Sequence, residues 1–237
     1  MAFLSMPNGR EKGVSACVPH TIDDNRVNPL IPDSERDELL STIGVERKPI
    51  VETGVTSSDL CLAAAERLID ELKWRKEDIE GLIFVSQTPD YILPATSCIL
   101  EYVDRGDGKV QNNLHSNLDG MSVFSFAISQ APKSIKKLCE CYGINMDCFV
   151  FHQANYFLNE KVRKKLKLPA EKVPYSLKEY GNSSCATIPV TLVTQWRERL
   201  QSSRQRIIGC GFGVGLSWSS VYFETEKSIV VPELIVL

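Results

Sequence analysis

Short apolar segments alternate with amphipathic helical segments along this sequence. Ile79–Ser86 and Cys148–Phe151 are each too apolar to expose one face to water, so two buried strands are predicted there. A helix that starts at Ser57 or Ser58 has apolar residues at the i+4 spacing of one buried face: Leu60, Ala64, Leu68 and Leu72. Helices joined to buried strands by short polar links are typical of an α/β fold.

The rest of the chain follows the same alternation. Further strands are expected over 13–18, 207–210 and 216–224, and further helices over 35–43, 124–142, 155–166 and 186–200. We therefore expect two related α/β halves, an N-terminal one over residues 1–100 and a C-terminal one over 120–237. Residues 101–119 form a joint that fits neither half, because the helix that opens at Pro94 stops after Leu100 without a capping glycine.

Composition narrows the class of protein. The 237-residue chain carries 27 Lys+Arg against 30 Asp+Glu, a formal net charge of −3, which is unlike a dedicated nucleic-acid binder. It has no apolar run near the roughly 20 residues that span a bilayer. Met1–Pro7 lacks the basic start of a signal peptide. We expect a cytoplasmic protein with neither membrane nor nucleic-acid partners and with its eight cysteines reduced.

Three motifs fall where predicted strands, helices and turns meet. His152 follows Cys148–Phe151, Asn182 lies in the turn Tyr180–Ser184, and four glycines alternate with larger residues across Gly209–Gly215. Ligands bind α/β sheets at such strand ends, and a glycine turn lets backbone N–H groups approach an oxyanion. Taken singly, a structural histidine, a turn asparagine and a β-turn are the more common explanations. Their joint occurrence favours a catalytic site.

The sequence around these residues resembles a known family. The matching motifs are Thr88–Thr96, His152-Gln153-Ala154-Asn155, Gly181-Asn182-Ser183-Ser184 and Gly213–Trp218. Their order and approximate spacing are similar to those of 3-oxoacyl-(acyl carrier protein) synthase III, an initiating condensing enzyme of fatty-acid synthesis. The resemblance covers about 13–100 and 120–223 and implies a thiolase-like fold of two related α/β halves, incomplete in this sequence.

The resemblance implies a reaction and roles for particular residues. The family is an acyltransferase that performs a decarboxylative Claisen condensation of an acyl thioester, acyl-CoA, with malonyl-acyl carrier protein. His152 and Asn182 match the catalytic pair that steadies negative charge on thioester oxygens. Gly213 and Gly215 match the stretch whose backbone helps form an oxyanion site. No cofactor is expected beyond these substrates, and the family implies acyl carrier protein as partner and a homodimer.

The family's cysteine nucleophile has no counterpart here. It belongs to a central region that is absent, with the break near Leu100–Glu101. Cys98 matches an ordinary helix position. Cys61 lies on a predicted helix next to Leu60 and Cys185 follows the Asn182 turn, and neither is favoured as the nucleophile. Three explanations are open: residues missing from this sequence, an internal deletion in the gene, or a non-catalytic relative. The alternative function is therefore a thiolase-fold remnant or module that binds acyl carrier protein without turnover.

Two charged or metal-binding patterns remain. Lys164 and Lys165 match a basic pair with which the family docks its acidic carrier protein, although a solvated helix face is an equally good explanation. Cys139, Cys141, Cys148 and His152 do not have the spacing of a standard zinc site. We therefore predict carrier-protein docking at Lys164 and Lys165, and we assign no metal site.

Overall fold

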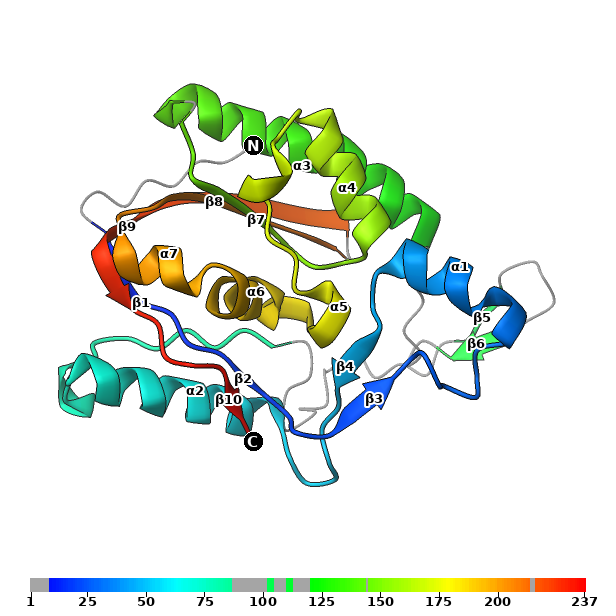
Figure 1. Ribbon diagram of the computed structural model, residues 1–237, viewed down its shortest axis with the longest axis horizontal. Coiled ribbons are helices and arrows are strands. Elements are labelled where there is room, and N and C mark those ends of the chain that lie inside the picture. Colours follow the sequence, from blue (N-terminus) through cyan, green and yellow to red (C-terminus); the bar gives the residue numbers. More distant parts are fainter. Residues whose placement is uncertain (1–8, 87–101, 105–109, 113–119, 144, 214–215) are drawn as a thin grey trace.

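A computed structural model describes residues 9–86, 102–104, 110–112, 120–143, 145–213 and 216–237. The junction Leu100–Glu101, Cys98 and most of the expected joint lie outside the described residues. The division into halves at 100 and 120 consequently stays a prediction. The described part is a mixed sheet with helices on both faces (Figure 1).

The central sheet has four strands in the order β1-β9-β8-β7. They span Glu11–Gly13 (β1), Ser217–Val230 (β9), Arg206–Gly213 (β8) and Cys148–Phe151 (β7). β7 pairs with β8 in parallel, so that Phe151 lies opposite Cys210, whereas β8 and β9 are antiparallel neighbours. All four residues of β7 are buried, as the wholly apolar strand sequence predicted.

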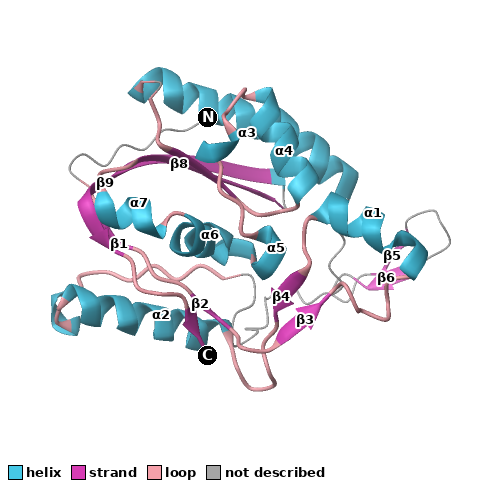
Figure 2. Ribbon diagram, in the orientation of Figure 1, coloured by secondary structure: helices cyan, strands magenta, loops and turns pink. Residues whose placement is uncertain are grey.

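Helices cover both faces of this sheet (Figure 2). On one face lie α3 (Gly120–Tyr142) and α4 (Tyr156–Lys165). On the other lie α5 (Leu177–Tyr180), α6 (Thr187–Gln195) and α7 (Arg197–Ser202). Beyond them, β2 (Cys17–Val18) pairs with β10 (Ile235–Val236), and α2 (Ser57–Leu72) forms the outermost layer. The sheet is thus enclosed between two apolar cores, one on each face.

The predicted helices have local causes. α4 begins because the Asn155 side chain accepts a hydrogen bond from the Leu158 N–H at 2.8 Å. α2 begins at a reciprocal capping box between Thr56 and Asp59. α1 (Asp33–Ile43) ends at Gly44, whose φ of 73° is readily adopted only by glycine. These starts and stops confirm the expected helices.

The remaining described elements are short. β3 (Ile22–Asp24) pairs with β4 (Arg47–Pro49), and β5 (Tyr102–Asp104) pairs with β6 (Val110–Asn112). Three 3₁₀ turns span Lys76–Asp78, Ala170–Lys172 and Ser184–Ala186. The last of these leads directly into α6 and belongs to the candidate site.

Three sequence expectations were wrong. Ile79–Ser86 forms no strand in the described structure, and Leu82 and Ile83 are 86% and 90% exposed, because no described strand pairs with this segment. The strand expected over 13–18 is divided into β1 and β2. The helix expected over 186–200 is divided at Trp196, whose buried indole N–H donates to Gln205 Oε1 at 3.1 Å.

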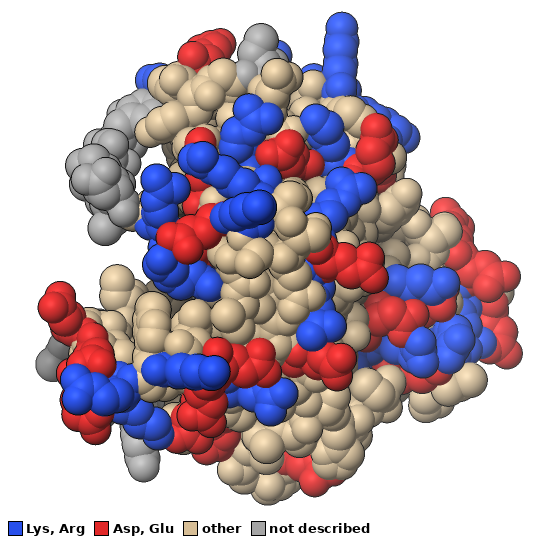
Figure 3. Space-filling model, turned by 60° about the vertical axis from the view of Figure 1, so that its left-hand side comes forward, with Lys and Arg blue, Asp and Glu red and all other residues tan. Residues whose placement is uncertain are grey.

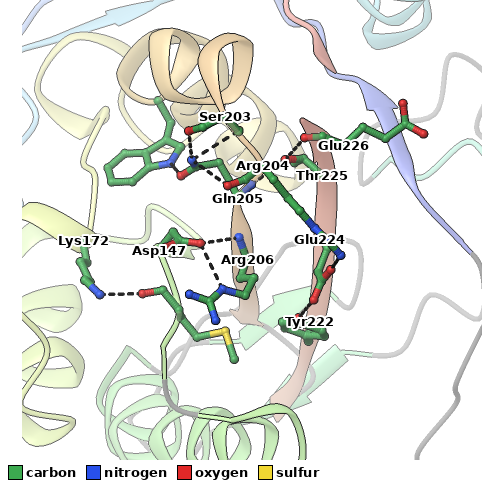
Figure 4. A network of polar contacts seen from close by, with 12 residues as sticks. Asp147, Lys172, Ser203, Arg204, Gln205, Arg206, Tyr222, Glu224, Thr225 and Glu226 are labelled. Atoms are coloured by element: carbon green, nitrogen blue, oxygen red, sulfur yellow. Dashed lines mark hydrogen bonds and ion pairs between the residues drawn. The ribbon is translucent and has the colours of Figure 1, made fainter. Parts of the chain in front are cut away.

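Polar contacts fix the start of β8 between its two neighbours (Figure 4). The Arg206 N–H donates to Asp147 Oδ2 at 2.8 Å, just before β7. The Gln205 N–H donates to Thr225 Oγ1 at 2.8 Å in β9. Because Thr225 and Gln205 are buried, these bonds satisfy groups that would otherwise destabilise the fold, and they set the register of three strands.

The surface mixes charges of both signs. On the face that Figure 3 displays, Lys and Arg side chains lie among Asp and Glu side chains. Exposed pairs such as Arg197 with Glu233, at 3.6 Å, contribute little to stability because water screens them. The surface drawn in Figure 3 therefore has no large field of a single sign.

One ion pair on α4 predicts a pH dependence of stability. Glu160 accepts hydrogen bonds from Arg163 Nε at 2.7 Å and from the Tyr175 hydroxyl at 2.9 Å. The bond from Arg163 is the main reason that the pKa of Glu160 is lowered to about 2. A carboxyl group with a lowered pKa stabilises the fold above its unfolded pKa, near 4.3, and loses that contribution as pH falls through about 2.

We therefore expect Glu160→Gln to destabilise the protein by an amount that is constant above about pH 5 and shrinks toward pH 2. Urea unfolding at a series of pH values measures the difference in unfolding free energy. Glu140→Gln, on the exposed face of α3, is the matched control. A difference between wild type and Glu160→Gln that stays constant down to pH 2 would contradict this account.

Candidate functional site

His152 is fixed through its backbone at the end of β7. Its N–H donates to the Cys210 carbonyl at 2.8 Å, which extends the pairing with β8 by one residue. Its carbonyl accepts from Asn159 Nδ2 at 3.1 Å, a side chain fully buried in α4. The Phe212 ring meets the imidazole edge-on, with centroids 5.8 Å apart. The position of His152 is therefore set by a strand, a helix and an aromatic neighbour.

The imidazole ring is half-buried against the start of α6. Its Nδ1 lies 2.8 Å from Thr187 Oγ1. Burial lowers the pKa of His152, and a hydrogen bond to the Ser184 backbone opposes this shift in part. The imidazole is consequently neutral at neutral pH, so one of its nitrogens is free to accept a hydrogen bond.

Asn182 lies in an exposed turn that orients its carboxamide. Gly181 precedes it with φ 61°, where a Cβ atom would also lie only 3.1 Å from Lys48 Cβ. The Asn182 Oδ1 accepts from the Ser184 N–H at 3.0 Å. This bond uses the oxygen of the amide and leaves its NH₂ group without a partner among the described residues. Asn182 is thus a hydrogen-bond donor that faces solvent.

Ser184 joins these two predicted residues. Its N–H donates to the Asn182 side chain, and its carbonyl accepts from Thr187 Oγ1 at 2.9 Å. A hydrogen bond with the Ser184 backbone also offsets part of the lowering of the His152 pKa. A positive φ of 53° lets Ser184 present both groups in this turn. The structure therefore brings His152 and Asn182, 30 positions apart in the sequence, to either side of one residue.

The glycine-rich stretch differs from the expected turn. Gly209, Gly211 and Gly213 belong to β8, because antiparallel pairing with β9 continues to Gly213 opposite Ser217. At Gly209 a Cβ atom would lie 3.3 Å from Val221 Cγ1, so the close pairing of the strands explains this glycine. Gly213 ends the strand that carries Phe212, and Gly215 lies outside the described residues.

Lys164 and Lys165 are exposed in the last turn of α4. Lys164 forms an i,i+4 ion pair with Glu160 at 3.6 Å. Lys165 Nζ donates to the Ile128 carbonyl of α3 at 3.1 Å. Both ammonium groups reach solvent, and docking to a carrier protein stays a prediction.

The described thiols offer no obvious nucleophile. Cys148 and Cys210 are fully buried, and burial raises the pKa of Cys148 strongly and that of Cys210 to about 11, which makes both thiols inert. Cys185 is exposed next to the site, and its Sγ donates to the Val85 carbonyl at 3.3 Å. Cys61 is exposed on α2. In the described ranges, no three His, Cys, Asp or Glu side chains are grouped so that they could hold a metal ion.

Sequence reasoning missed the polar residues behind His152. Gln153 is fully buried; its Nε2 donates to the Phe151 carbonyl at 2.8 Å and its Oε1 accepts from the Ser176 N–H at 3.2 Å. Thr187 and Thr191 are buried on α6. The available signal was the pair Thr187 and Thr191, four residues apart in a mainly apolar helix, a spacing that places both on one face.

Comparison with known proteins places this arrangement in a class. The chain is similar to a solved 3-oxoacyl-(acyl-carrier protein) synthase from Burkholderia xenovorans LB400, with 25% identity, a TM-score of 0.83, and coverage of 96% of this chain and 97% of that one. The fold is that of a thiolase-like α/β protein, as the sequence predicted. A family model described as 3-oxoacyl-(acyl-carrier-protein) synthase III, C terminal, matches residues 144–225. The C-terminal part of the chain is therefore similar to the C-terminal part of 3-oxoacyl-(acyl carrier protein) synthase III proteins.

Curated relatives show the same kinship and a difference in length. The β-ketoacyl-(acyl-carrier-protein) synthase III of Geobacillus kaustophilus is 22% identical over 298 residues, which cover 88% of this chain and 96% of the relative. Because 88% of 237 residues falls far short of 298, the relative carries residues that have no counterpart here. The Streptococcus gordonii protein of the same name is 35% identical over 132 residues, only 40% of its own length. The chain thus spans less than half of that relative.

None of the described helices combines the length and apolar character that a bilayer-spanning segment requires.

Proposed function

We propose that this chain acts on acyl carrier protein thioesters, in the decarboxylative condensation of an acyl-CoA with malonyl-acyl carrier protein in fatty-acid biosynthesis. The observation that carries the proposal is the linkage of His152 and Asn182 through Ser184 at the end of the sheet. Relatives and a solved neighbour are named as synthases of this kind. Acyl-CoA and acyl carrier protein are the substrate and partner that the similarity to these proteins supports.

The two side chains suit the decarboxylation step. When a malonyl thioester loses CO₂, negative charge develops on the thioester oxygen, and fixed donors aimed at that oxygen lower the barrier. The Asn182 NH₂ group is a donor whose direction is set by its bond to Ser184. Because Nδ1 of His152 lies against Thr187 Oγ1, its Nε2 is the nitrogen available to donate to the same thioester oxygen. Gly213, at the end of β8 near Phe212, is where backbone N–H groups would assist.

The acyl-transfer step needs a thiolate that the described residues do not supply. We therefore propose that the chain by itself performs decarboxylation, and that condensation requires a cysteine from the region that longer relatives carry. The alternative is a module that binds acyl carrier protein without turnover. The same observation supports it, because no nucleophile is assigned among the described cysteines. We also propose a homodimer in the cytoplasm, with no cofactor beyond the substrates, in keeping with the family.

Two measurements on the purified chain test these proposals. Incubation with malonyl-acyl carrier protein should release CO₂ and leave acetyl-acyl carrier protein, which mass spectrometry detects. Incubation with acyl-CoA should give no acyl adduct on the protein if the nucleophile is missing. Carrier-protein binding without any CO₂ release would favour the module, and absence of both binding and release would overturn the proposed function.

Lys164 and Lys165 offer a test of carrier-protein docking. Reversing both charges (Lys164→Glu, Lys165→Glu) should weaken binding of the acidic carrier protein several-fold at low ionic strength. The difference should fade as salt rises, because charges are screened beyond about 10 Å at 0.1 M. Isothermal titration across a salt series measures both effects, with Lys73→Glu, Lys227→Glu as a control elsewhere on the surface. Equal affinities of wild type and variant at low salt would rule out docking at this pair.

A further inference from the structure

The segment that joins β1 to β2 lies against helix α2 (Figure 1). A Cβ atom on Gly13 would lie 2.7 Å from Leu68 Cδ1, and the Ser15 hydroxyl donates to the Ala64 carbonyl at 2.5 Å. The two contacts come from residues two apart in the segment, and their partners are four apart in the helix. As the segment advances toward β2, its contacts therefore move back toward the start of α2, so that the two elements run antiparallel.

The next position along this contact pairs two cysteines. Ala16 and Val18 are 5% and 6% exposed in the core that contains α6, so Cys17 between them points to the opposite side, toward α2. On the helix, Cys61 lies seven residues before Leu68, two turns back on the same face. Four residues of extended chain span about 13 Å and seven residues of helix about 10 Å, so the two elements stay in step. Cys17 and Cys61 therefore face each other.

The surroundings of the two sulfur atoms agree with this placement. Both cysteines are thiols in the structure, with Cys61 exposed and Cys17 half-buried. Burial raises the pKa of Cys17, and the charge of a Cys61 thiolate raises it further, an effect that a distant charge would not have. An accessible thiol thus lies beside a sheltered one.

We infer that Cys17 and Cys61 are a redox-sensitive pair that hydrogen peroxide converts to a disulfide. The exposed Cys61 thiolate attacks one peroxide oxygen, the O–O bond breaks, and Cys61 becomes a sulfenic acid as hydroxide leaves. The Cys17 sulfur loses its proton and attacks the Cys61 sulfur, the S–O bond breaks, and hydroxide leaves again. The two thiols lose two electrons and two protons, and the peroxide is reduced to two molecules of water.

The bond would fasten the outermost helix to the body of the protein. No residue of α2, a helix that the structure describes in full, is fully buried, so the helix is held by partial contacts. β2, in contrast, pairs with β10 and carries Val18 in the core. Because a disulfide also restricts the unfolded chain, oxidation should raise the thermal midpoint by about 5–10 °C. Neither the bond nor this shift depends on the proposed function.

Thiol mapping of the full chain tests the inference. The reduced chain is treated with equimolar hydrogen peroxide, the remaining thiols are blocked with N-ethylmaleimide, and non-reduced tryptic peptides are identified by mass spectrometry. We expect a linked pair of peptides that contain Cys17 and Cys61, loss of two of the eight thiols, and return of both after treatment with dithiothreitol. Circular dichroism during heating should show the higher midpoint in the oxidised chain alone.

Serine variants separate this pair from other thiols. Cys17→Ser and Cys61→Ser should each abolish the linked peptides and the shift in midpoint, whereas Cys141→Ser, which removes an exposed thiol from α3, should retain both. If Cys17→Ser does not fold, Cys61→Ser decides alone, because its side chain is exposed. The inference is overturned if Cys61 is oxidised while Cys17 stays a thiol, if Cys61 bonds to other cysteines as often as to Cys17, or if neither thiol is lost.

Discussion

Asn182→Ala is expected to lower the rate of malonyl-thioester decarboxylation by about 10²–10³-fold, the usual cost of removing one hydrogen-bond donor that stabilises an oxyanion. The amide NH₂ group has its direction set by the bond from the Ser184 N–H to Asn182 Oδ1. Alanine removes that donor, and water in its place is not held in direction. The loss should appear mainly in kcat, because the donor binds charge that develops in the transition state.

Asn28→Ala is the matched control for this prediction. Asn28 forms the same kind of turn, with its Oδ1 accepting from the Leu30 N–H at 2.9 Å, but it lies in the loop before α1. Its replacement should leave kcat within about twofold of wild type. If Asn182→Ala and Asn28→Ala had equal rates, Asn182 would be a turn residue and no more.

Phe151→Ala is expected to destabilise the protein by about 3–5 kcal/mol, as deletion of a buried ring does. Phe151 is 0% exposed at the end of β7, within the core between the sheet and helices α3 and α4. Its carbonyl also accepts from Gln153 Nε2 at 2.8 Å, so the cavity would form directly behind the site. Urea unfolding, followed by circular dichroism, measures the loss as a lower midpoint.

Phe157→Ala supplies the comparison for this loss. Phe157 is 45% exposed on α4, where it stacks on Phe124 with centroids 5.7 Å apart. Its removal should cost less than about 1.5 kcal/mol, the upper end for one aromatic pair. Should Phe151→Ala unfold at the same urea concentration as Phe157→Ala, the core assigned to α3, α4 and the sheet would be wrong. If Phe151→Ala cannot be purified folded, Phe151→Leu should still show a smaller destabilisation in the same direction.

Local signals explain which parts of the fold the sequence predicted. Asn155 caps α4 through its own neighbour Leu158, and Gly44 ends α1 through its own φ angle, so both are visible in a few residues. The strand predicted over Ile79–Ser86 was wrong because burial of a strand depends on partners elsewhere in the chain. An apolar run carries no information on whether such partners are present.

The candidate site shows the same boundary between local and tertiary information. Motifs singled out His152 and Asn182, but nothing in either motif shows that Ser184 forms backbone hydrogen bonds with both side chains. Thr187 was not singled out because its hydroxyl matters only once α6 packs against β7. Gly213 was predicted to lie in a turn, whereas it is the last residue of β8 and pairs with Ser217, only four residues further on.

The exposed segment Ile79–Ser86, which follows α2, affects the solubility of the protein and its lifetime in cells. The side chains of Leu82 and Ile83 are exposed, and no described strand pairs with the backbone of this segment. Such stretches adhere to one another as concentration rises, and in cells they are captured by chaperones or cut by proteases. Yield and lifetime of the chain should therefore depend on dilution and on folding helpers more than on the strength of its two cores.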